Sequence, residues 1–210
     1  MKRFLLALST LALAASAAFA QVNVVPQEGV QTAYLPKATF SAAFFGLVPV
    51  TTASTDQICI AGSAAKTIKL QRLTIWGTTA TANQTVALSL VRRASADTGG
   101  TAASTTANPA NTIAKRDTTS AAATATLVSY TAAPTIVDTS PTYIETQMLT
   151  MSLVVSTLGA FPVDFNYGTD VGNLVNPPVL RGANQQLCVN NATALTNASS
   201  WSGMIQWTEE

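Results

Sequence analysis

Apolar and polar side chains alternate through the last eleven residues of the chain, SWSGMIQWTEE. One side of the alternation carries Trp201, Gly203, Ile205 and Trp207, and the other carries Ser202, Met204 and Gln206. A period of two residues is that of a β-strand, in which successive side chains point to opposite faces. The pattern therefore predicts a strand at 200–210 with both indoles on one face, around which the rest of the chain is organised.

The same alternation recurs upstream between clusters of Gly, Pro and Asn, which mark turns. It predicts strands at 55–60, 66–76, 84–92, 125–130, 143–155, 161–167, 178–181 and 186–190. No segment has convincing helical periodicity. Eight or nine short strands predict an all-β fold, a single-domain antiparallel β-sandwich of jelly-roll or Greek-key type with an extended N-terminal arm.

One predicted strand changes phase halfway along. Ile68 and Leu70 share one face, whereas Leu73 and Ile75 fall on the other if the alternation is regular. An extra residue inserted in one strand of a pair restores the phase, because it shifts the following side chains by one position. We therefore expect a β-bulge near Gln71 and Arg72.

The first 54 residues have a different pattern from the predicted strands. Residues 1–20 have a basic start, an apolar run and an A-x-A ending, which predict a secretory signal peptide with Gln21 as the mature start; the alternative is an uncleaved hydrophobic arm. Residues 21–54 contain Pro26, Pro36 and Pro49, which would interrupt one long strand, and are interpreted as a proline-containing arm. The β-sandwich domain is then 55–210.

Two stretches are candidates for contacts with other molecules. Phe40, Phe44 and Phe45 lie together in the arm, and would form an interface if they are exposed; the alternative is that they belong to the core. Residues 94–112 have no periodicity and many turn formers, which predicts an exposed excursion that makes surface contacts or a loop with no role.

Composition narrows the class of partner. Hydrophobic residues make up 48% of the chain and charged residues only 10%. The formal net charge of +1 becomes −1 once Lys2 and Arg3 leave with the leader, with nine basic against ten acidic residues. The mature chain has no excess of basic residues that could bind phosphates, so we expect no nucleic-acid partner, and no membrane association after removal of the leader. So weakly charged a surface suggests contacts with other subunits.

The two cysteines, Cys59 and Cys188, each lie in a predicted strand. In an oxidising compartment they could form a disulfide that stabilises the fold by roughly 4 to 5 kcal/mol on the chain-entropy model. The alternative is two buried free thiols.

Candidate chemistry is sparse. The chain has no histidine, which excludes Ser-His-Asp and Cys-His catalysis and imidazole metal sites. Glu145, Asp164 and Asp170 are candidates for carboxylate-pair hydrolysis, although nothing beyond their presence supports it. Asp164, Asn166 and Asp170 are also weak calcium-ligand candidates at D-x-N-x-G-x-D spacing, against a polar strand face that runs into a turn. We therefore expect no enzyme activity and no cofactor.

Five collinear blocks of sequence resemble a known group of proteins. They are 66–68 with Gly77, SLVRRASADTGGT at 89–101, AAATATLVSYTAAPT at 121–135, VLRG at 179–182 and QWTEE at 206–210. Together they resemble small β-proteins associated with phages and prophages. The resemblance implies a virion-associated, non-enzymatic jelly-roll protein, such as a capsid decoration or appendage subunit, that forms homo-oligomers or a capsid-like lattice. It brings no catalytic residues.

The predicted leader and the cysteine pair depart from that group, because virions of tailed phages assemble in the cytoplasm. These features indicate an exported protein that is periplasmic, at the cell surface or extracellular. The alternative function is a secreted or surface-exposed β-sandwich that binds glycans or cell surfaces, since Trp76, Trp201 and Trp207 could stack on sugars if they are exposed.

Overall fold

The computed structural model describes residues 37–103, 112–153, 161–168 and 176–210. The predicted leader, residues 21–36 of the arm and Asp170 lie outside them. The described residues form strands and connecting segments, with no helix. The strands are β1 (Ala38–Leu47), β2 (Thr55–Ala61), β3 (Thr67–Thr79), β4 (Gln84–Arg93), β5 (Thr101–Ala102), β6 (Ala114–Lys115), β7 (Thr126–Ala132), β8 (Thr142–Leu153), β9 (Val163–Asn166), β10 (Val179–Arg181), β11 (Gln186–Asn191) and β12 (Ser199–Glu209).

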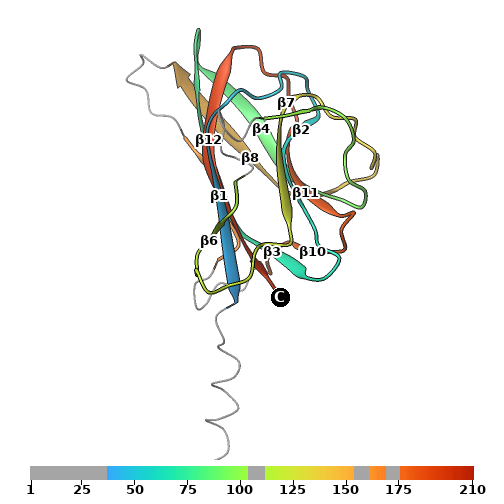
Figure 1. Ribbon diagram of the computed structural model, residues 1–210. Helices are drawn as coiled ribbons and strands as arrows, with labels where there is room; N and C mark the ends of the chain where they lie inside the picture. The colour runs from blue at the N-terminus through green and yellow to red at the C-terminus, as the bar shows by residue number, and fades with distance from the viewer. Residues whose placement is uncertain (1–36, 104–111, 154–160, 169–175) are drawn as a thin grey trace, which may run out of the picture. The chain divides into compact units, whose positions relative to one another are not determined.

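All nine segments predicted to be strands contain one, which confirms the all-β class. Ten strands pair in the order β5-β7-β2-β11-β4-β8-β3-β12-β1-β6, and β9 and β10 pair with β3 beside this series. The sheet curls into a half-barrel, so that β12 and β1 face β7, β2 and β11 in Figure 1. A single core can then form on its concave side.

One pairing is parallel, so the prediction of a wholly antiparallel sheet is wrong. β8 pairs antiparallel with β4 along most of its length, but its last residues pair parallel with the end of β3, through Thr78 with Ser152 and Thr79 with Leu153. A long strand that has one partner on each side joins the two halves of the curled sheet. The sheet is therefore mixed and continuous at this point.

The described sheet begins before residue 55, where the sequence placed the boundary between arm and domain. Residues 38–47 form β1, which pairs with β12 from Ala38 opposite Glu209 to Leu47 opposite Trp201. The compact unit accordingly runs from Ala38 to Glu210. Pro49 lies just outside the strand, so it limits the length of β1 without preventing its formation.

The alternation in β12 places both indoles in the core, as predicted. Trp201 and Trp207 are each 0% exposed, and Trp207 stacks on Phe40 of β1 with ring centroids 5.8 Å apart. Gly203 lies between the two tryptophans, where a Cβ atom would come within 2.2 Å of the carbonyl oxygen of Thr74. This close approach explains a residue without a side chain in the middle of a central strand.

The predicted bulge in β3 is confirmed at Gln71. Gln206 of β12 pairs with Arg72 and the next residue, Trp207, pairs with Leu70, which leaves Gln71 without a partner in the ladder. The extra residue restores the inward phase, so that the apolar side chains on both sides of it are buried in the same core. The buried residues are Ile68, Leu70, Leu73 and Ile75.

Part of the predicted excursion at 94–112 folds back on the sheet. Thr98 forms a bridge with Thr135, and β5 pairs with β7. The side chain of Asp97 is fully buried. Residues 94 and 98–102 are exposed, as the first interpretation expects, but the segment also covers part of the outer face of β2 and β11 through Asp97. Residues 104–111 lie outside the described part.

Candidate functional site

A buried polar cluster lies on the face of β2, β11 and β4 that is turned away from the main core. A β-bulge creates it, because Ile58 pairs with Val189 and Asp56 pairs with the following Asn190, which leaves Gln57 as an extra residue. In a regular strand Asp56 and Cys59 would point to opposite faces. The bulge puts them on the same face.

The structure joins Cys59 and Cys188 by a disulfide, which is the first of the two alternatives left open by the sequence. The two residues are directly opposite in the ladder between β2 and β11, with Cα atoms 4.1 Å apart. Val50 and Tyr130 pack with them in a small second apolar cluster. Burial there raises the pKa of Tyr130 to about 12, with a further contribution from the charges of Asp97 and Asp56.

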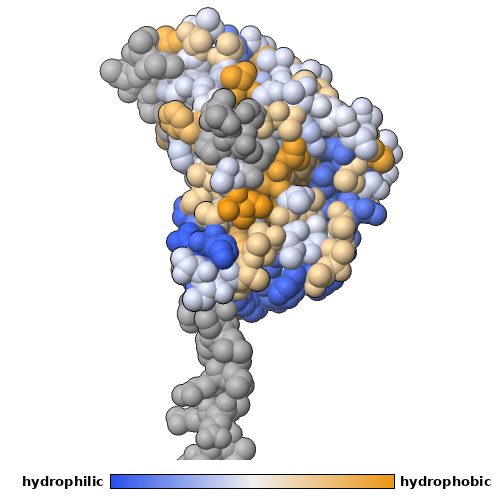
Figure 2. All heavy atoms as spheres, viewed as in Figure 1, coloured by the Kyte–Doolittle hydropathy of each residue, from blue (hydrophilic) through white to orange (hydrophobic). Residues whose placement is uncertain are grey.

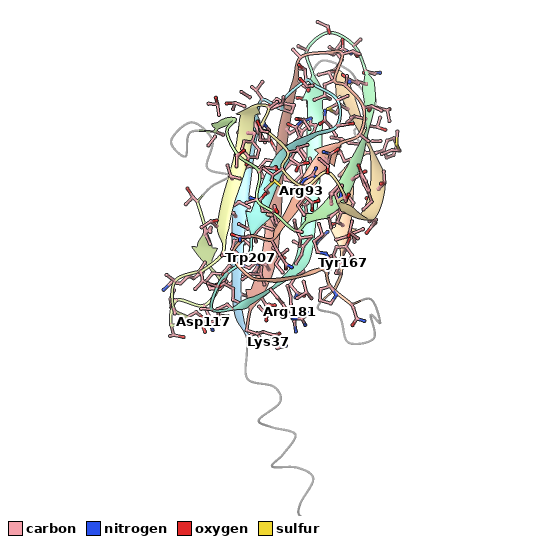
Figure 3. The ribbon with its side chains drawn as sticks, turned by 90° about the vertical axis from the view of Figure 1, so that its right-hand side faces the viewer. Lys37, Arg93, Asp117, Tyr167, Arg181 and Trp207 are labelled. Atoms are coloured by element: carbon pink, nitrogen blue, oxygen red, sulfur yellow. A yellow bond between two sulfur atoms is a disulfide. The ribbon has the colours of Figure 1, made fainter. Side chains whose placement is uncertain are left out.

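Arg93 and Asp56 form a buried ion pair beside this disulfide. The guanidinium donates two hydrogen bonds to the carboxylate, one from Nη2 to Oδ1 at 2.8 Å and one from Nε to Oδ2. Asn190 donates a third from Nδ2 to Asp56 Oδ1 at 2.6 Å, and Arg93 Nη1 donates to the carbonyl oxygen of Asp138 at 3.0 Å. Asp56 is 0% exposed and Arg93 is 2% exposed, so the pair is well hydrogen-bonded but fully desolvated. Figure 3 shows Arg93 among the strands of the sheet, away from both ends of the molecule.

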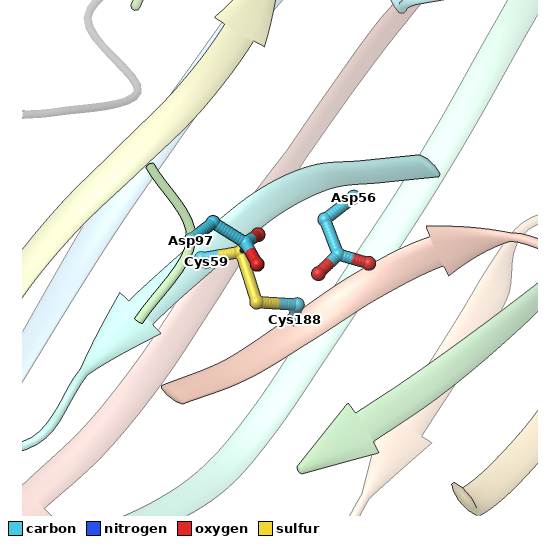
Figure 4. Close-up of side chains that lie close together, drawn as sticks. All are labelled: Asp56, Cys59, Asp97 and Cys188. Atoms are coloured by element: carbon cyan, nitrogen blue, oxygen red, sulfur yellow. Dashed lines mark hydrogen bonds between the residues drawn. A yellow bond between two sulfur atoms is a disulfide. The ribbon is translucent and has the colours of Figure 1, made fainter. Parts of the chain in front are cut away.

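Asp97 adds a second buried carboxyl to the one buried guanidinium. Its Oδ1 lies 3.9 Å from Arg93 Nε and has no hydrogen-bond partner among the described residues. Figure 4 shows the carboxyl groups of Asp97 and Asp56 turned toward one another beside the disulfide. Burial, followed by hydrogen bonding with Asp56 and its negative charge, raises the pKa of Asp97 to about 7. The cluster is therefore close to electrical balance only while Asp97 carries a proton.

The same cluster is the one group of potential metal ligands found in the described residues. Asp56, Cys59, Asp97 and Cys188 offer ligand atoms within 4.8 Å of one another. Sulfur binds metal as a thiolate, whereas both sulfurs here share a disulfide bond. Arg93 also occupies both oxygens of Asp56. While the disulfide is formed, these residues therefore make a structural ion pair between Arg93 and Asp56 beside the disulfide.

The weak calcium candidates are engaged in other contacts where the structure describes them. Asp164 accepts hydrogen bonds from Arg72 Nε at 2.9 Å and Nη2 at 2.8 Å, and from the Thr74 hydroxyl at 3.0 Å. Arg72 holds the pKa of Asp164 below its usual range. Asn166 Oδ1 accepts the N–H of Gly168 at 3.0 Å, which is a local turn contact. Asp164 and Asn166 therefore belong to a polar strand face that runs into a turn.

Glu145, the other carboxylate candidate, is linked to Asp164 through Gln147. The Gln147 amide accepts from the N–H of Asp164 and donates to its carbonyl, both at 3.0 Å, and also donates to Glu145. The Tyr167 hydroxyl donates to Glu145 at 2.9 Å, and burial together with this contact raises the pKa of Tyr167. Glu145 and Asp164 are thus tied into strand-to-strand contacts, not turned to a common cleft.

The arm aromatics divide between core and surface. Phe40 is 1% exposed and Phe44 is 2% exposed, so these two interface candidates are core residues, whereas Phe45 is 77% exposed. A bulge at Phe45 and Gly46 lies opposite Ser202 of β12, and Ser202 also pairs with Trp76 of β3, which is 45% exposed. Ser202 is only 7% exposed, and its hydroxyl oxygen accepts the N–H of Gly46 at 3.3 Å.

A shallow groove continues this row along β3 and β12. It has a volume of about 230 Å³ and is lined by Val48, Thr78, Thr79, Ala80, Ala198, Ser199 and Ser200. None of the lining residues is charged, and Val48 at its rim is 64% exposed. We call Phe45, Val48 and Trp76, with this groove, the outer apolar row. The alternation in β1 and β3 could have indicated which of its residues point outward, but not that Phe45 and Trp76 fall on the two sides of Ser202 in the register.

Hydrophilic residues gather around β6, away from the outer apolar row. Figure 2 shows hydrophilic residues around β6 and hydrophobic ones between β1 and β7. Asp117, in the segment after β6, accepts the N–H and hydroxyl of Thr119, and these contacts lower the pKa of Asp117.

Comparisons with known proteins add no relative: no protein-family model, curated protein or solved structure matches the chain. In the part of the chain that the structure describes, no helical segment has the length and apolarity to cross a bilayer.

Proposed function

We propose that this protein is a non-enzymatic structural subunit that assembles with copies of itself, as a virion-associated subunit or its exported relative. In this proposal the half-barrel is a variant of the jelly-roll or Greek-key sandwich. As in a sandwich, two facing groups of strands, β7 and β2 on one side and β12 and β1 on the other, contribute side chains to one core. The observation that carries the assembly function is the outer apolar row. Large apolar side chains exposed side by side on a sheet favour a protein contact.

The contacts of the acidic residues favour a protein that works by binding over one that works by catalysis. Asp164 and Glu145, the described candidates for carboxylate chemistry, are held by Arg72, Tyr167 and Gln147. The side chains of Asp56 and Asp97 are buried between β2 and the segment 94–103, and neither described pocket is lined by them. The predicted net charge of −1 for the mature chain opposes self-association only weakly.

Size-exclusion chromatography with light scattering tests the proposal. We expect the purified protein to form oligomers, and Phe45→Ser or Trp76→Ser to shift it toward the monomer, because each change removes an aromatic ring from the outer apolar row. Tyr143→Ser is a matched control: Tyr143 is 62% exposed but lies on β8, outside the row. A wild-type protein that stays monomeric at high concentration would refute self-assembly.

The alternative function, binding to glycans on a cell surface, depends on one residue. Trp201 and Trp207 are buried, so Trp76 is the described tryptophan available to stack on a sugar ring, and hydroxyl groups of Thr78 and Ser200 line the adjacent groove. A glycan array distinguishes the two functions. Binding that is lost in Trp76→Ser and kept in Tyr143→Ser would favour the glycan function.

A further inference from the structure

The carboxyl group of Asp97 is aimed into the buried polar cluster without a partner of its own. Its side chain is 0% exposed, and its Oδ1 accepts no hydrogen bond from the described part of the chain. The guanidinium of Arg93 is matched to both oxygens of Asp56, and its Nε lies 3.9 Å from Asp97 Oδ1. Buried carboxyl oxygens are normally hydrogen-bonded, so an unmatched one points to a missing ligand.

The bonded sulfurs of Cys59 and Cys188 lie directly beside that carboxyl group, as Figure 4 shows. Asp97 Oδ2 is 3.8 Å from Cys59 Sγ, and the side-chain oxygen of the buried Gln186 is 3.8 Å from Cys188 Sγ. The N–H of Asp97 donates to the same Gln186 oxygen at 3.0 Å. Two sulfurs and two oxygens therefore converge from β2, β11 and the segment 94–103.

These separations are close to those of ligands on one tetrahedral metal ion. With bonds of about 2.3 Å to sulfur and about 2.0 Å to oxygen, a zinc ion holds sulfur and oxygen ligands about 3.5 Å apart and two sulfurs about 3.8 Å apart. The oxygens are already near this distance from the sulfurs. Once the disulfide is broken, rotation about χ1 separates the sulfurs, because Cys59 and Cys188 are directly opposite in the ladder with Cα atoms 4.1 Å apart.

We propose that reduction of the Cys59–Cys188 disulfide converts this cluster into a binding site for Zn²⁺, with the two thiolates and the Asp97 carboxylate as ligands and the Gln186 oxygen at the fourth position. A thiol reductant supplies two electrons and is itself oxidised to a disulfide, while each cysteine sulfur takes up one proton. Zn²⁺ then displaces both thiol protons. Thiolates select zinc over Mg²⁺ and Ca²⁺, which take oxygen ligands.

The charges of the buried cluster favour this exchange. Since Arg93 is paired with Asp56, an ionised Asp97 leaves one negative charge without a counterion. A divalent ion that replaces two thiol protons does not change the net charge of the cluster, and it places a cation directly against Asp97. Asp56 stays with Arg93, so its charge faces the ion without coordinating it.

This inference is independent of the proposed self-assembly and concerns how the sheet is held together. In an oxidising compartment the disulfide links β2 to β11. In a reducing compartment the zinc ion links the same two strands, and it also holds the segment 94–103 through Asp97. The two cysteines then fasten the fold under both conditions.

Binding of Co²⁺ and Zn²⁺ to the full chain tests the site. The protein is reduced with a phosphine, which is oxidised to its oxide, in urea that exposes the buried disulfide, and is then diluted without oxygen into buffer containing Co²⁺. We expect one Co²⁺ per chain, with the near-ultraviolet charge-transfer band of thiolate ligands and the strong visible bands of tetrahedral cobalt. Adding Zn²⁺ should remove both, and the oxidised protein should show neither.

Variants of Asp97 distinguish this site from two cysteines that bind metal by themselves. Asp97→Asn should weaken Zn²⁺ binding by more than about tenfold, whereas Asp117→Asn, at an exposed aspartate, should leave it unchanged. Asp97→Cys should strengthen the charge-transfer band in proportion to a third thiolate. A purely electrostatic role of Asp97 would not produce that gain, because the introduced sulfur would then not coordinate the cobalt.

Zn²⁺ should also raise the urea midpoint of the reduced protein, measured by the fluorescence of the buried Trp201 and Trp207, and leave that of the oxidised protein unchanged. A reduced chain that refolds without a cobalt band overturns the inference, and so does equal Zn²⁺ affinity of Asp97→Asn and the wild type. A reduced chain that stays unfolded in the presence of Zn²⁺ overturns it as well, since the ligands converge only in the folded protein.

Discussion

Replacing Asp97 with asparagine should stabilise the protein at neutral and alkaline pH. The side chain is fully buried, and its neighbours are Asp56 of β2, Arg93 of β4, the half-buried Asp138 and the neutral Tyr130 of β7. One guanidinium cannot balance two buried carboxylates. An asparagine side chain has nearly the same shape as an aspartate but carries no charge, so the variant avoids ionisation within the cluster.

The magnitude follows from the pKa of Asp97, which rises from an ordinary 3.8 to about 7 in the folded protein. Below about pH 4 the carboxyl is protonated in both states, and its contribution to stability is fully present. Between about pH 4 and 7 the unfolded chain loses this proton while the folded protein keeps it, so stability falls as the pH rises. A shift of about three units at about 1.4 kcal/mol each gives a loss of about 4 kcal/mol. Local opening of residues 94–103 would reduce this loss, which makes it an upper bound.

Urea unfolding followed by tryptophan fluorescence measures this difference, because Trp201 and Trp207 are both buried. We expect the free energy of unfolding of Asp97→Asn minus that of the wild type to increase between about pH 4 and pH 8. Asp117→Asn is the control, since contacts with Thr119 lower the pKa of Asp117 and its loss should give no such gain. A difference that is constant across this pH range would refute the charge imbalance.

Three further substitutions test the disulfide, the close packing at Gly203 and the buried carboxylate of Glu209. Replacing both Cys59 and Cys188 with alanine opens a loop with a sequence separation of 129, and should lower the free energy of unfolding by up to about 5 kcal/mol, whereas an unchanged urea midpoint would contradict a stabilising disulfide. Gly203→Ala places a Cβ atom 2.2 Å from a backbone oxygen, so we expect a loss of more than about 2 kcal/mol; wild-type thermal stability would contradict this packing. Glu209→Gln should cost about 1 to 3 kcal/mol near neutral pH and less in acid, whereas the same change at the more exposed Glu210 should cost little.

The acid dependence at Glu209 has the opposite sign from that at Asp97. Burial alone would raise the pKa of the Glu209 carboxyl, but hydrogen bonds from the Thr124 hydroxyl and N–H, the Ala125 N–H and the Trp207 indole outweigh it and lower the pKa. The charged form is therefore favoured in the folded protein. Its contribution is present above the ordinary pKa of a glutamate and is lost as the pH falls through the lowered value.

Residue alternation was sufficient to predict nine of the strands and the bulge at Gln71, because inward side chains must be apolar wherever one face of a sheet is buried. It was not sufficient for β1. Residues 38–47 contain alanine at inward and outward positions, at Ala42 and Ala43, which blurs the alternation, and the nearby prolines suggested an irregular arm. The parallel pairing of β8 with β3 involves only a few residues, so no pattern in the sequence could mark it.

The buried charge cluster could not be predicted from sequence spacing. Asp56 and Cys59 are three residues apart, which in a regular strand separates them onto opposite faces. Only the bulge at Gln57 brings them together, and the apolar alternation of β2 begins after it. Asp97 lies in a stretch with no periodicity, so the sequence favoured exposure. In contrast, the pairing of Cys59 with Cys188 was one of two alternatives that the sequence left open.

The short pairing of β1 with β6 and the half-barrel shape have a common origin in the segment around β6. To close a barrel, the strands after β1 would have to continue along it until they met β7. Instead, Ile113 turns into the core and β6 pairs with β1 over only two residues, after which the chain crosses to β7 through 116–125. Glu209 holds this crossing by accepting the N–H groups of Thr124 and Ala125. The contacts that cover the core at this end therefore also limit the pairing of β1 with β6 to two residues, which explains why the described sheet ends as a half-barrel.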